Sequence, residues 1–244
     1  MIRFIITIIF VLLFLIFSLI LQPIMLLVGL FSKRARGTAS LAIVNWAFRV
    51  VLFLAGTKAT VIGEENVPKD RPVLYVLNHR SFFDILLTYT RVPRQTGYVA
   101  KKEMTRYLTL TWWMMLLHCE FLDRKDLRKG MKTINDCAEK IKNGISIAIY
   151  PEGTRNKGGE DMLPFHGGSF KIAEKSNCLV IPVVLNNTSA VFEDHLPKLK
   201  KAHVTVEYLP PLDVAAMDRE ARKALPETVH RQMVETYQKN KALV

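Results

Sequence analysis

The stretch "PVLYVLNHRSFFDILL", residues 72–87, decides how this chain folds. Its apolar start, "PVLYVL" (Pro72–Leu77), has the length of a buried strand, and a second apolar run begins at Ile85. The polar interval between them, "NHRSFFD", places the imidazole of His79 and the carboxylate of Asp84 five residues apart. A strand that becomes a helix through such an interval is typical of α/β proteins.

From about residue 58 onward, the chain repeats this alternation of strand-like and helix-like segments. The clearest helix runs from Leu127 to Lys142, between a capping Asp126 and a terminating Gly144. The alternation predicts an α/β fold with a largely parallel sheet flanked by helices. The expected strands are Lys58–Ile62, Val73–Leu77, Gly97–Ala100, Cys119–Leu122, Ile145–Tyr150, Leu179–Leu185 and His203–Leu209.

The N-terminal region has a different character. Gln22, which Pro23 follows, is the only strongly polar residue between Phe4 and Leu30. A helix over Phe4–Leu21 would be ~27 Å long, close to the ~30 Å hydrocarbon core of a bilayer. Because no cleavage site of small residues follows, we expect a retained membrane anchor and not a removed signal peptide.

A second apolar segment, Leu41–Gly56, carries Asn45 and Arg49 one helical turn apart on a single face. That polar strip favours a helix lying in the membrane interface over a second span. The basic cluster Lys33–Arg36 precedes it and, by the positive-inside rule, would stay in the cytoplasm. We therefore expect a protein of the inner cell membrane whose catalytic or binding domain faces the cytoplasm.

Length and composition narrow the possibilities further. The 244 residues suffice for one sizeable domain, so we expect a membrane-anchoring helical segment over residues 1–56 and an α/β domain over residues 57–244. The net charge is +12, and no acid precedes Glu64. Without a nucleic-acid motif, such a balance favours anionic lipid or a phosphorylated substrate. Cys119, Cys137 and Cys178 lack metal-type spacing and are expected to be free thiols.

Three polar clusters follow expected strands. They are "NHRSFFD" after Leu77, "FLDR" (Phe121–Arg124), and "PEGTR" (Pro151–Arg155) after Tyr150. Ligands of parallel α/β sheets bind at the carboxyl ends of the strands, so the three clusters should share one site.

His79 and Asp84 allow two interpretations. In the structural one, Ser81 caps a helix, Asp84 completes an S-x-x-D capping box, and His79 is a buried, hydrogen-bonded ring. In the functional one, the Asp84 carboxylate fixes the tautomer of His79, whose other ring nitrogen becomes a general base. A serine nucleophile at Ser81 is disfavoured, because no G-x-S-x-G elbow exists, and the other histidines lack metal-ligand spacing.

The "PEGTR" cluster points to an anion. Gly153 permits a turn with positive φ or a close backbone approach to a ligand. The planar fork of Arg155 suits phosphate, and Arg124 ends another strand nearby in the expected sheet. The structural alternative is a surface turn in which Arg155 or Arg124 pairs with a neighbouring acid, such as Glu152 or Asp123.

Together, these clusters resemble the motifs of a known family, the glycerolipid acyltransferases. "NHRSFFD" resembles their H-x-x-x-x-D box, "FLDR" their F-x-x-R block, and "PEGTR" their E-G-T-R block. "VIPVV" (Val180–Val184) is similar to their fourth, proline-containing block, and "KKEM" (Lys101–Met104) to the K-x-E-L element. The likeness covers roughly residues 60–213 in the family's order, and it is nearest to bacterial 1-acyl-sn-glycerol-3-phosphate acyltransferases.

The resemblance implies a role for each position. His79 would deprotonate the free hydroxyl of lysophosphatidic acid, and Asp84 would orient and charge-balance His79. The oxygen would attack the thioester of acyl-CoA or acyl-acyl-carrier protein, giving phosphatidic acid without a cofactor or covalent enzyme intermediate. Arg124 and Arg155, with Lys101, would bind the phosphate of lysophosphatidic acid. The pocket would be shaped by Glu152, Gly153 and Thr154.

Two departures and three alternatives stay open. Leu108 and Thr111 replace the usual Pro-x-x-Gly, so chain-length preference does not transfer, and His166 replaces a lysine in the usual "PFKxG". "NHRS" in place of the common "NHQS" leaves the acceptor open, so glycerol-3-phosphate or another lysophospholipid is the first alternative. The others are a thioesterase and a non-catalytic membrane lipid-binding protein.

Overall fold

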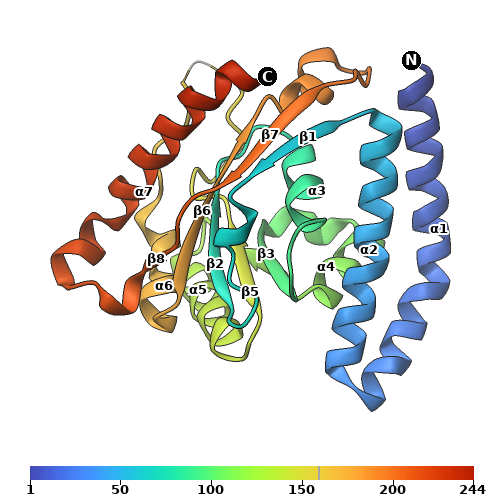
Figure 1. The fold of residues 1–244 in the computed structure, drawn as a ribbon. Coiled ribbons are helices and arrows are strands. Elements are labelled where there is room, and N and C mark those ends of the chain that lie inside the picture. Colours follow the sequence, from blue (N-terminus) through green and yellow to red (C-terminus); the bar gives the residue numbers. More distant parts are fainter. Residues whose placement is uncertain (159) are drawn as a thin grey trace.

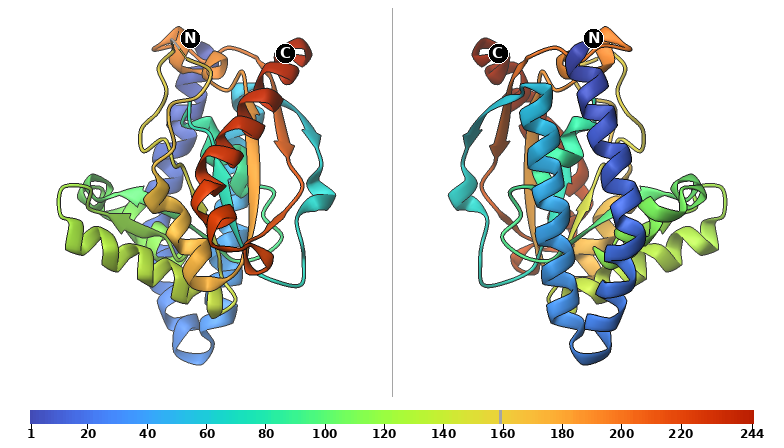
Figure 2. Two further views of the ribbon diagram at one scale, coloured as in Figure 1. Left: turned by 90° about the vertical axis from the view of Figure 1, so that its left-hand side faces the viewer. Right: turned by 90° about the vertical axis from the view of Figure 1, so that its right-hand side faces the viewer.

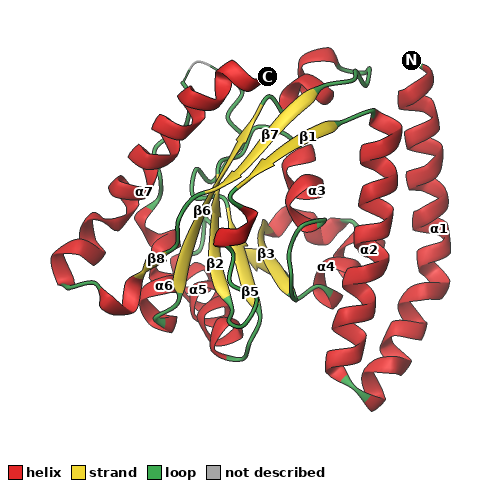
Figure 3. Ribbon diagram, in the orientation of Figure 1, coloured by secondary structure: helices red, strands yellow, loops and turns green. Residues whose placement is uncertain are grey.

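A computed structural model describes residues 1–158 and 160–244, and it places an eight-stranded mixed sheet at the centre of the molecule (Figures 1 and 3). The strand order is β1-β7-β6-β2-β5-β3-β4, and β8 pairs with β6. Every neighbouring pair is parallel except β6–β7 and β6–β8. The strands are β1 (Lys58–Ile62), β2 (Val73–Leu77), β3 (Thr96–Lys101), β4 (Glu120–Leu122), β5 (Ser146–Ile149), β6 (Leu179–Asn186), β7 (His203–Tyr208) and β8 (Leu212–Asp213). The predicted largely parallel α/β fold is confirmed.

The strand β2 occupies the middle of this sheet, between β5 and β6. All five of its residues are buried, because helices cover the sheet on both faces. Leu74 and Val76 face one hydrophobic cluster, whereas Val73, Tyr75 and Leu77 face the other. The continuous apolar run Pro72–Leu77 is therefore the signature of a central parallel strand.

Helices form the outer two layers of the sandwich (Figure 2). One face of the sheet is covered by α1 to α4, and the opposite face by α5 to α7 (Figures 1 and 2). As predicted, α5 runs from Leu127 to Lys142, and the Asp126 carboxylate accepts a hydrogen bond from the Lys129 N–H. The helices are α1 (Ile2–Phe31), α2 (Lys33–Ala55), α3 (Phe83–Tyr89), α4 (Leu108–Leu116), α5 (Leu127–Lys142), α6 (Lys171–Ser176) and α7 (Arg219–Asn240).

The two N-terminal helices form an antiparallel hairpin that turns at Ser32 (Figure 1). The first helix, α1, is longer than the stretch Phe4–Leu21 considered from the sequence, since it continues through Pro23 to Phe31 and contains 30 residues. Proline removes one intrahelical hydrogen bond, and contacts with α2 and α4 hold the helix in place. Each helix is long and apolar enough to cross a membrane.

The buried polar residues of α1 face the protein, and many of its apolar residues face outward. Ser18 is fully buried and accepts a hydrogen bond from the Trp113 indole at 2.8 Å, whereas the Gln22 amide donates to the Thr109 carbonyl at 2.7 Å. This reversal of the usual pattern indicates membrane association. The outward apolar residues include Ile5, Ile9, Leu12, Ile16, Phe17 and Leu19.

The polar strip of α2 also contacts the protein. The Arg49 guanidinium donates to the Thr90 carbonyl at 3.3 Å, at the end of α3. Near the hairpin turn, the Gln95 amide donates to the Arg34 carbonyl at 3.0 Å. Contacts at two places along α2 hold this helix against the α/β domain. Packing thus explains Arg49 in the strip, and the depth of α2 in the membrane stays a prediction.

Candidate active site

The loop between β2 and α3 holds the His79–Asp84 pair. The Asp84 side chain is fully buried, and its Oδ2 atom lies 2.8 Å from Nδ1 of His79. The same oxygen accepts hydrogen bonds from the backbone N–H groups of Arg80 and Ser81, each at 2.7 Å. The two interpretations of this motif therefore coexist: Asp84 reaches back to the backbone, as in a capping box, and also binds the imidazole.

The tautomer of His79 follows from these contacts. A carboxylate only accepts hydrogen bonds, so Nδ1 of His79 carries the proton in its contact with Asp84. The Nε2 atom then keeps a free lone pair. The His79 side chain is 17% exposed to solvent, whereas the Asp84 side chain is not exposed at all. Solvent or a substrate can thus reach the His79 imidazole, with a buried carboxylate behind it.

Residues of the β5 end fix His79 from the other side. The imidazole stacks on the Tyr150 ring with 4.1 Å between centroids, and burial holds the pKa of Tyr150 well above its usual value. The His79 N–H donates to Oε1 of Glu152 at 2.6 Å, and its carbonyl accepts from the Asn156 N–H at 2.7 Å. The first and third predicted clusters therefore form one site, as expected.

Glu152 is itself a buried connector between loops. Its Oε2 atom accepts from the Leu163 N–H at 2.9 Å, while Oε1 binds His79. Burial raises the pKa of Glu152, and the two backbone N–H groups act in the opposite direction. Glu152 thus holds the backbone of the site in place from beneath.

The second cluster reaches the site at Gly153. This residue has φ of +73°, as its predicted role in a turn requires. A Cβ atom there would lie 3.1 Å from the His166 ring and 3.3 Å from Nη1 of Arg124. The exposed side chains of Arg124 and His166 therefore flank a glycine that leaves room between them. The imidazole of His166 therefore lies close to Arg124.

Arg155 occupies a more enclosed position than the sequence indicated. Its guanidinium carbon lies 3.9 Å from the centroid of the Phe82 ring, and its Nη1 atom donates to Oε1 of Glu193 at 3.2 Å. The predicted alternative of a pairing with Glu152 is wrong, because Glu152 faces the interior. Glu193 was not predicted from the sequence, and the one available signal was its position shortly after the fourth block.

The remaining predicted residues lie at the edge of the site. Lys101 is the last residue of β3, and both Lys101 and Thr154 are exposed. Among the described residues, neither makes a side-chain hydrogen bond with the His79–Asp84 pair. The fourth block, Val180–Val184, lies within β6 in the core, where Leu185 exchanges two hydrogen bonds with the buried Asn78 amide. The strand β6 thus supports the loop that carries His79.

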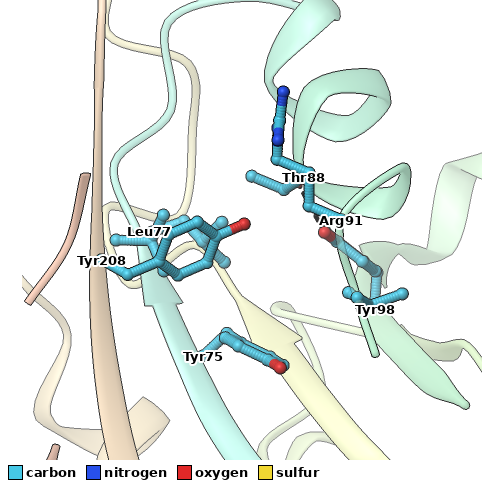
Figure 4. Close-up of a pocket in the computed structure, with 8 residues that line it drawn as sticks. Tyr75, Leu77, Thr88, Arg91, Tyr98 and Tyr208 are labelled. Atoms are coloured by element: carbon cyan, nitrogen blue, oxygen red, sulfur yellow. Dashed lines mark hydrogen bonds between the residues drawn. The ribbon is translucent and has the colours of Figure 1, made fainter. Parts of the chain in front are cut away.

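A small cavity lies between the sheet and α3 (Figure 4). Its volume of about 10 Å³ holds about one water molecule. Tyr75, Tyr98 and Tyr208 line it together with Thr88, whose hydroxyl lies 2.6 Å from the Tyr98 hydroxyl. This cavity is too small for a substrate.

The fold and the site together define a class: an α/β transferase with a His–Asp pair and arginines at the carboxyl ends of parallel strands, joined to an apolar helical hairpin. The family described as Acyltransferase matches residues 58–186, more than half of the chain. The chain belongs to this acyltransferase family. The predicted family is confirmed, and the bacterial branch stays a prediction.

Individual relatives agree with this assignment. The chain is 31% identical to the 1-acyl-sn-glycerol-3-phosphate acyltransferase of Saccharomyces cerevisiae, over 78% of this chain and 63% of the yeast protein. The enzyme of that name from Borreliella burgdorferi is 29% identical, over 76% and 74% of the two chains. The crystal structure of the 1-acyl-sn-glycerophosphate acyltransferase from Thermotoga maritima shares the fold, with a TM-score of 0.78, 23% identity and 98% of each chain covered.

Proposed function

We propose that the protein transfers an acyl group from a thioester to the free hydroxyl of 1-acyl-sn-glycerol 3-phosphate and so forms phosphatidic acid. The observation that carries this proposal is the 2.8 Å contact between Nδ1 of His79 and the buried Asp84 carboxylate. It leaves Nε2 as the base at the carboxyl ends of β2 and β5. The relatives named above bear the same activity in their names.

The reaction follows from the atoms of the pair. Nε2 of His79 takes the proton of the acceptor hydroxyl as the oxygen attacks the thioester carbonyl. The new C–O ester bond forms as the C–S bond breaks, and the thiolate leaves with the proton that His79 returns. The Asp84 carboxylate stabilises the imidazolium between these steps. General-base help of this kind accelerates a reaction by ~10²–10⁴-fold.

Positive charge near His79 supports a phosphorylated acceptor. We assign the phosphate to Arg124 and Arg155, with Lys101 at the rim, because their guanidinium and ammonium groups suit an anion. Gly153 leaves room between Arg124 and His166, and Thr154 completes the turn. Acyl-CoA or acyl-acyl-carrier protein serves as the donor.

The hairpin supports a membrane-borne acceptor. The apolar outer face of α1 is continuous along the helix, so lipid can cover it while α2 packs on the α/β domain. We place the apolar face of the hairpin, residues 1–56, in the inner cell membrane. The domain, residues 57–244, and the turn with Lys33–Arg36 both lie on the cytoplasmic side, because a hairpin that spanned the bilayer would carry this basic cluster across it. Protease protection of inside-out vesicles tests this orientation.

The deciding experiment measures acyl transfer to lysophosphatidic acid in mixed micelles with acyl-CoA and with acyl-acyl-carrier protein. We expect phosphatidic acid from the wild type and none from His79→Ala. His203→Ala is the matched control, because His203 is exposed at the start of β7 and its ring contacts Thr60. Equal activity of His79→Ala and the wild type would refute the mechanism.

Other products would select the alternatives. Release of free fatty acid without phosphatidic acid would indicate a thioesterase. Acylation of glycerol-3-phosphate or of another lysophospholipid would identify that compound as the acceptor. Lipid binding without turnover would indicate a non-catalytic binding protein.

A further inference from the structure

Glu193 joins the two halves of the candidate site from a distant part of the chain. It lies 112 residues from Ser81, yet its Oε2 atom accepts a hydrogen bond from the Ser81 hydroxyl at 2.7 Å. Its Oε1 atom accepts from the Phe82 N–H at 2.8 Å and from Nη1 of Arg155 at 3.2 Å. One carboxylate thus bridges the His79 loop and the arginine of the "PEGTR" turn.

The contacts of Arg155 leave part of its guanidinium available. Glu193 engages one of the five N–H donors, and the Phe82 ring covers the flat face at 3.9 Å. The side chains of Arg155 and Glu193 are 32% and 17% exposed, so their ion pair is partly shielded from water. A planar fork that is clamped in this way can present its remaining donors to a phosphate in one fixed direction.

The segment that carries Glu193 is itself held in place. The adjacent Phe192 stacks on Phe4 of α1 with 5.9 Å between ring centroids, and Val191 is fully buried. The Lys200 N–H donates to the Val191 carbonyl at 3.0 Å. Because these contacts hold the backbone just before Glu193, its carboxylate has a firm support.

We propose that Glu193 is a positioning residue that orients Arg155 toward the phosphate of the acceptor while it holds Ser81 and Phe82 of the His79 loop. This inference rests on the proposed function, since it assigns Arg155 to the acceptor phosphate. Glu193 acts through Arg155 and does not contact the reacting atoms.

Steady-state kinetics of Glu193→Ala and Glu193→Gln test the proposal. In Glu193→Ala, Arg155 loses a charge-assisted hydrogen bond, and we expect the KM for lysophosphatidic acid to rise about tenfold while the KM for the acyl donor stays unchanged. In Glu193→Gln, the amide oxygen still accepts from Phe82 and Arg155, and the amide nitrogen donates to Ser81. We expect this variant to stay within about threefold of the wild type.

Two further variants separate positioning from general destabilisation. In an Arg155→Ala background, adding Glu193→Ala should change the KM for lysophosphatidic acid less than twofold, because the residue it orients is gone. Asp194→Asn is the matched control: it removes a neighbouring charge whose carboxylate accepts from the Ser189 hydroxyl, and it should leave the KM unchanged.

Several results would overturn the proposal. An unchanged or lowered KM in Glu193→Ala would do so, as would an equal effect of Glu193→Ala with and without Arg155. If the wild type forms no phosphatidic acid, the proposed function fails, and titration with inorganic phosphate followed by ³¹P NMR decides the inference. About tenfold weaker phosphate binding in Glu193→Ala supports it, and equal binding or no binding by the wild type refutes it.

Discussion

Replacing Asp84 by asparagine removes the buried charge behind His79 and preserves the size of the side chain. Oδ2 lies 2.8 Å from Nδ1, so the centres of the carboxylate and imidazolium charges are about 4 Å apart. At an effective dielectric constant of about 20, two unit charges at that separation attract by about 4 kcal/mol. This attraction exists only while His79 is protonated, so its loss lowers kcat by about a thousandfold.

The variant should keep its fold. An asparagine oxygen in the place of Oδ2 still accepts from the N–H groups of Arg80 and Ser81. Asp84→Ala is the contrasting variant, because it leaves those donors unsatisfied at a cost of about 1–3 kcal/mol each. The assay measures phosphatidic acid formation at saturating lysophosphatidic acid, together with the melting temperature of each variant.

The reasoning would be refuted by a kcat of Asp84→Asn within tenfold of the wild type at an unchanged melting temperature. Such a result would mean that the imidazolium does not depend on this carboxylate during the reaction. His79 would then be a structural histidine in a capped loop.

Two other predictions follow from the backbone. Gly153→Ala introduces a Cβ at φ of +73° within 3.1 Å of the His166 ring and 3.3 Å of Arg124, so we expect about 1–2 kcal/mol lower stability and a several-fold higher KM for lysophosphatidic acid; a wild-type KM would contradict this. Burial lowers the pKa of His118 to about 4 from 6.5, so the folded state resists protonation. As the pH falls from about 6.5 to about 4, the free energy of unfolding of the wild type should therefore decrease by about 2 kcal/mol relative to that of His118→Asn. Asparagine is chosen because it suits the φ of +62° at this position. Parallel unfolding curves of the two proteins across this pH range would contradict the prediction.

Much of the fold was predictable because its determinants are local. The bounds of β1 and β2 and of the helix Leu127–Lys142 agree with the patterns of apolar residues and caps. The His79–Asp84 contact was also foreseeable, since a turn between a strand and a helix brings residues five apart within reach. The apolar character of residues 4–30 likewise indicated membrane association.

The sequence by itself determined the order of strands and helices, the apolar anchor, and the motif that holds a base beside an acid. Only the tertiary structure decided that α1 continues through Pro23, that the Tyr150 ring stacks on His79, and that Glu193 clamps Arg155. The physical reason is separation along the chain. Periodicity and capping report contacts within a few residues, whereas Glu193 reaches Ser81 across 112 residues, through a sheet order that no local pattern encodes.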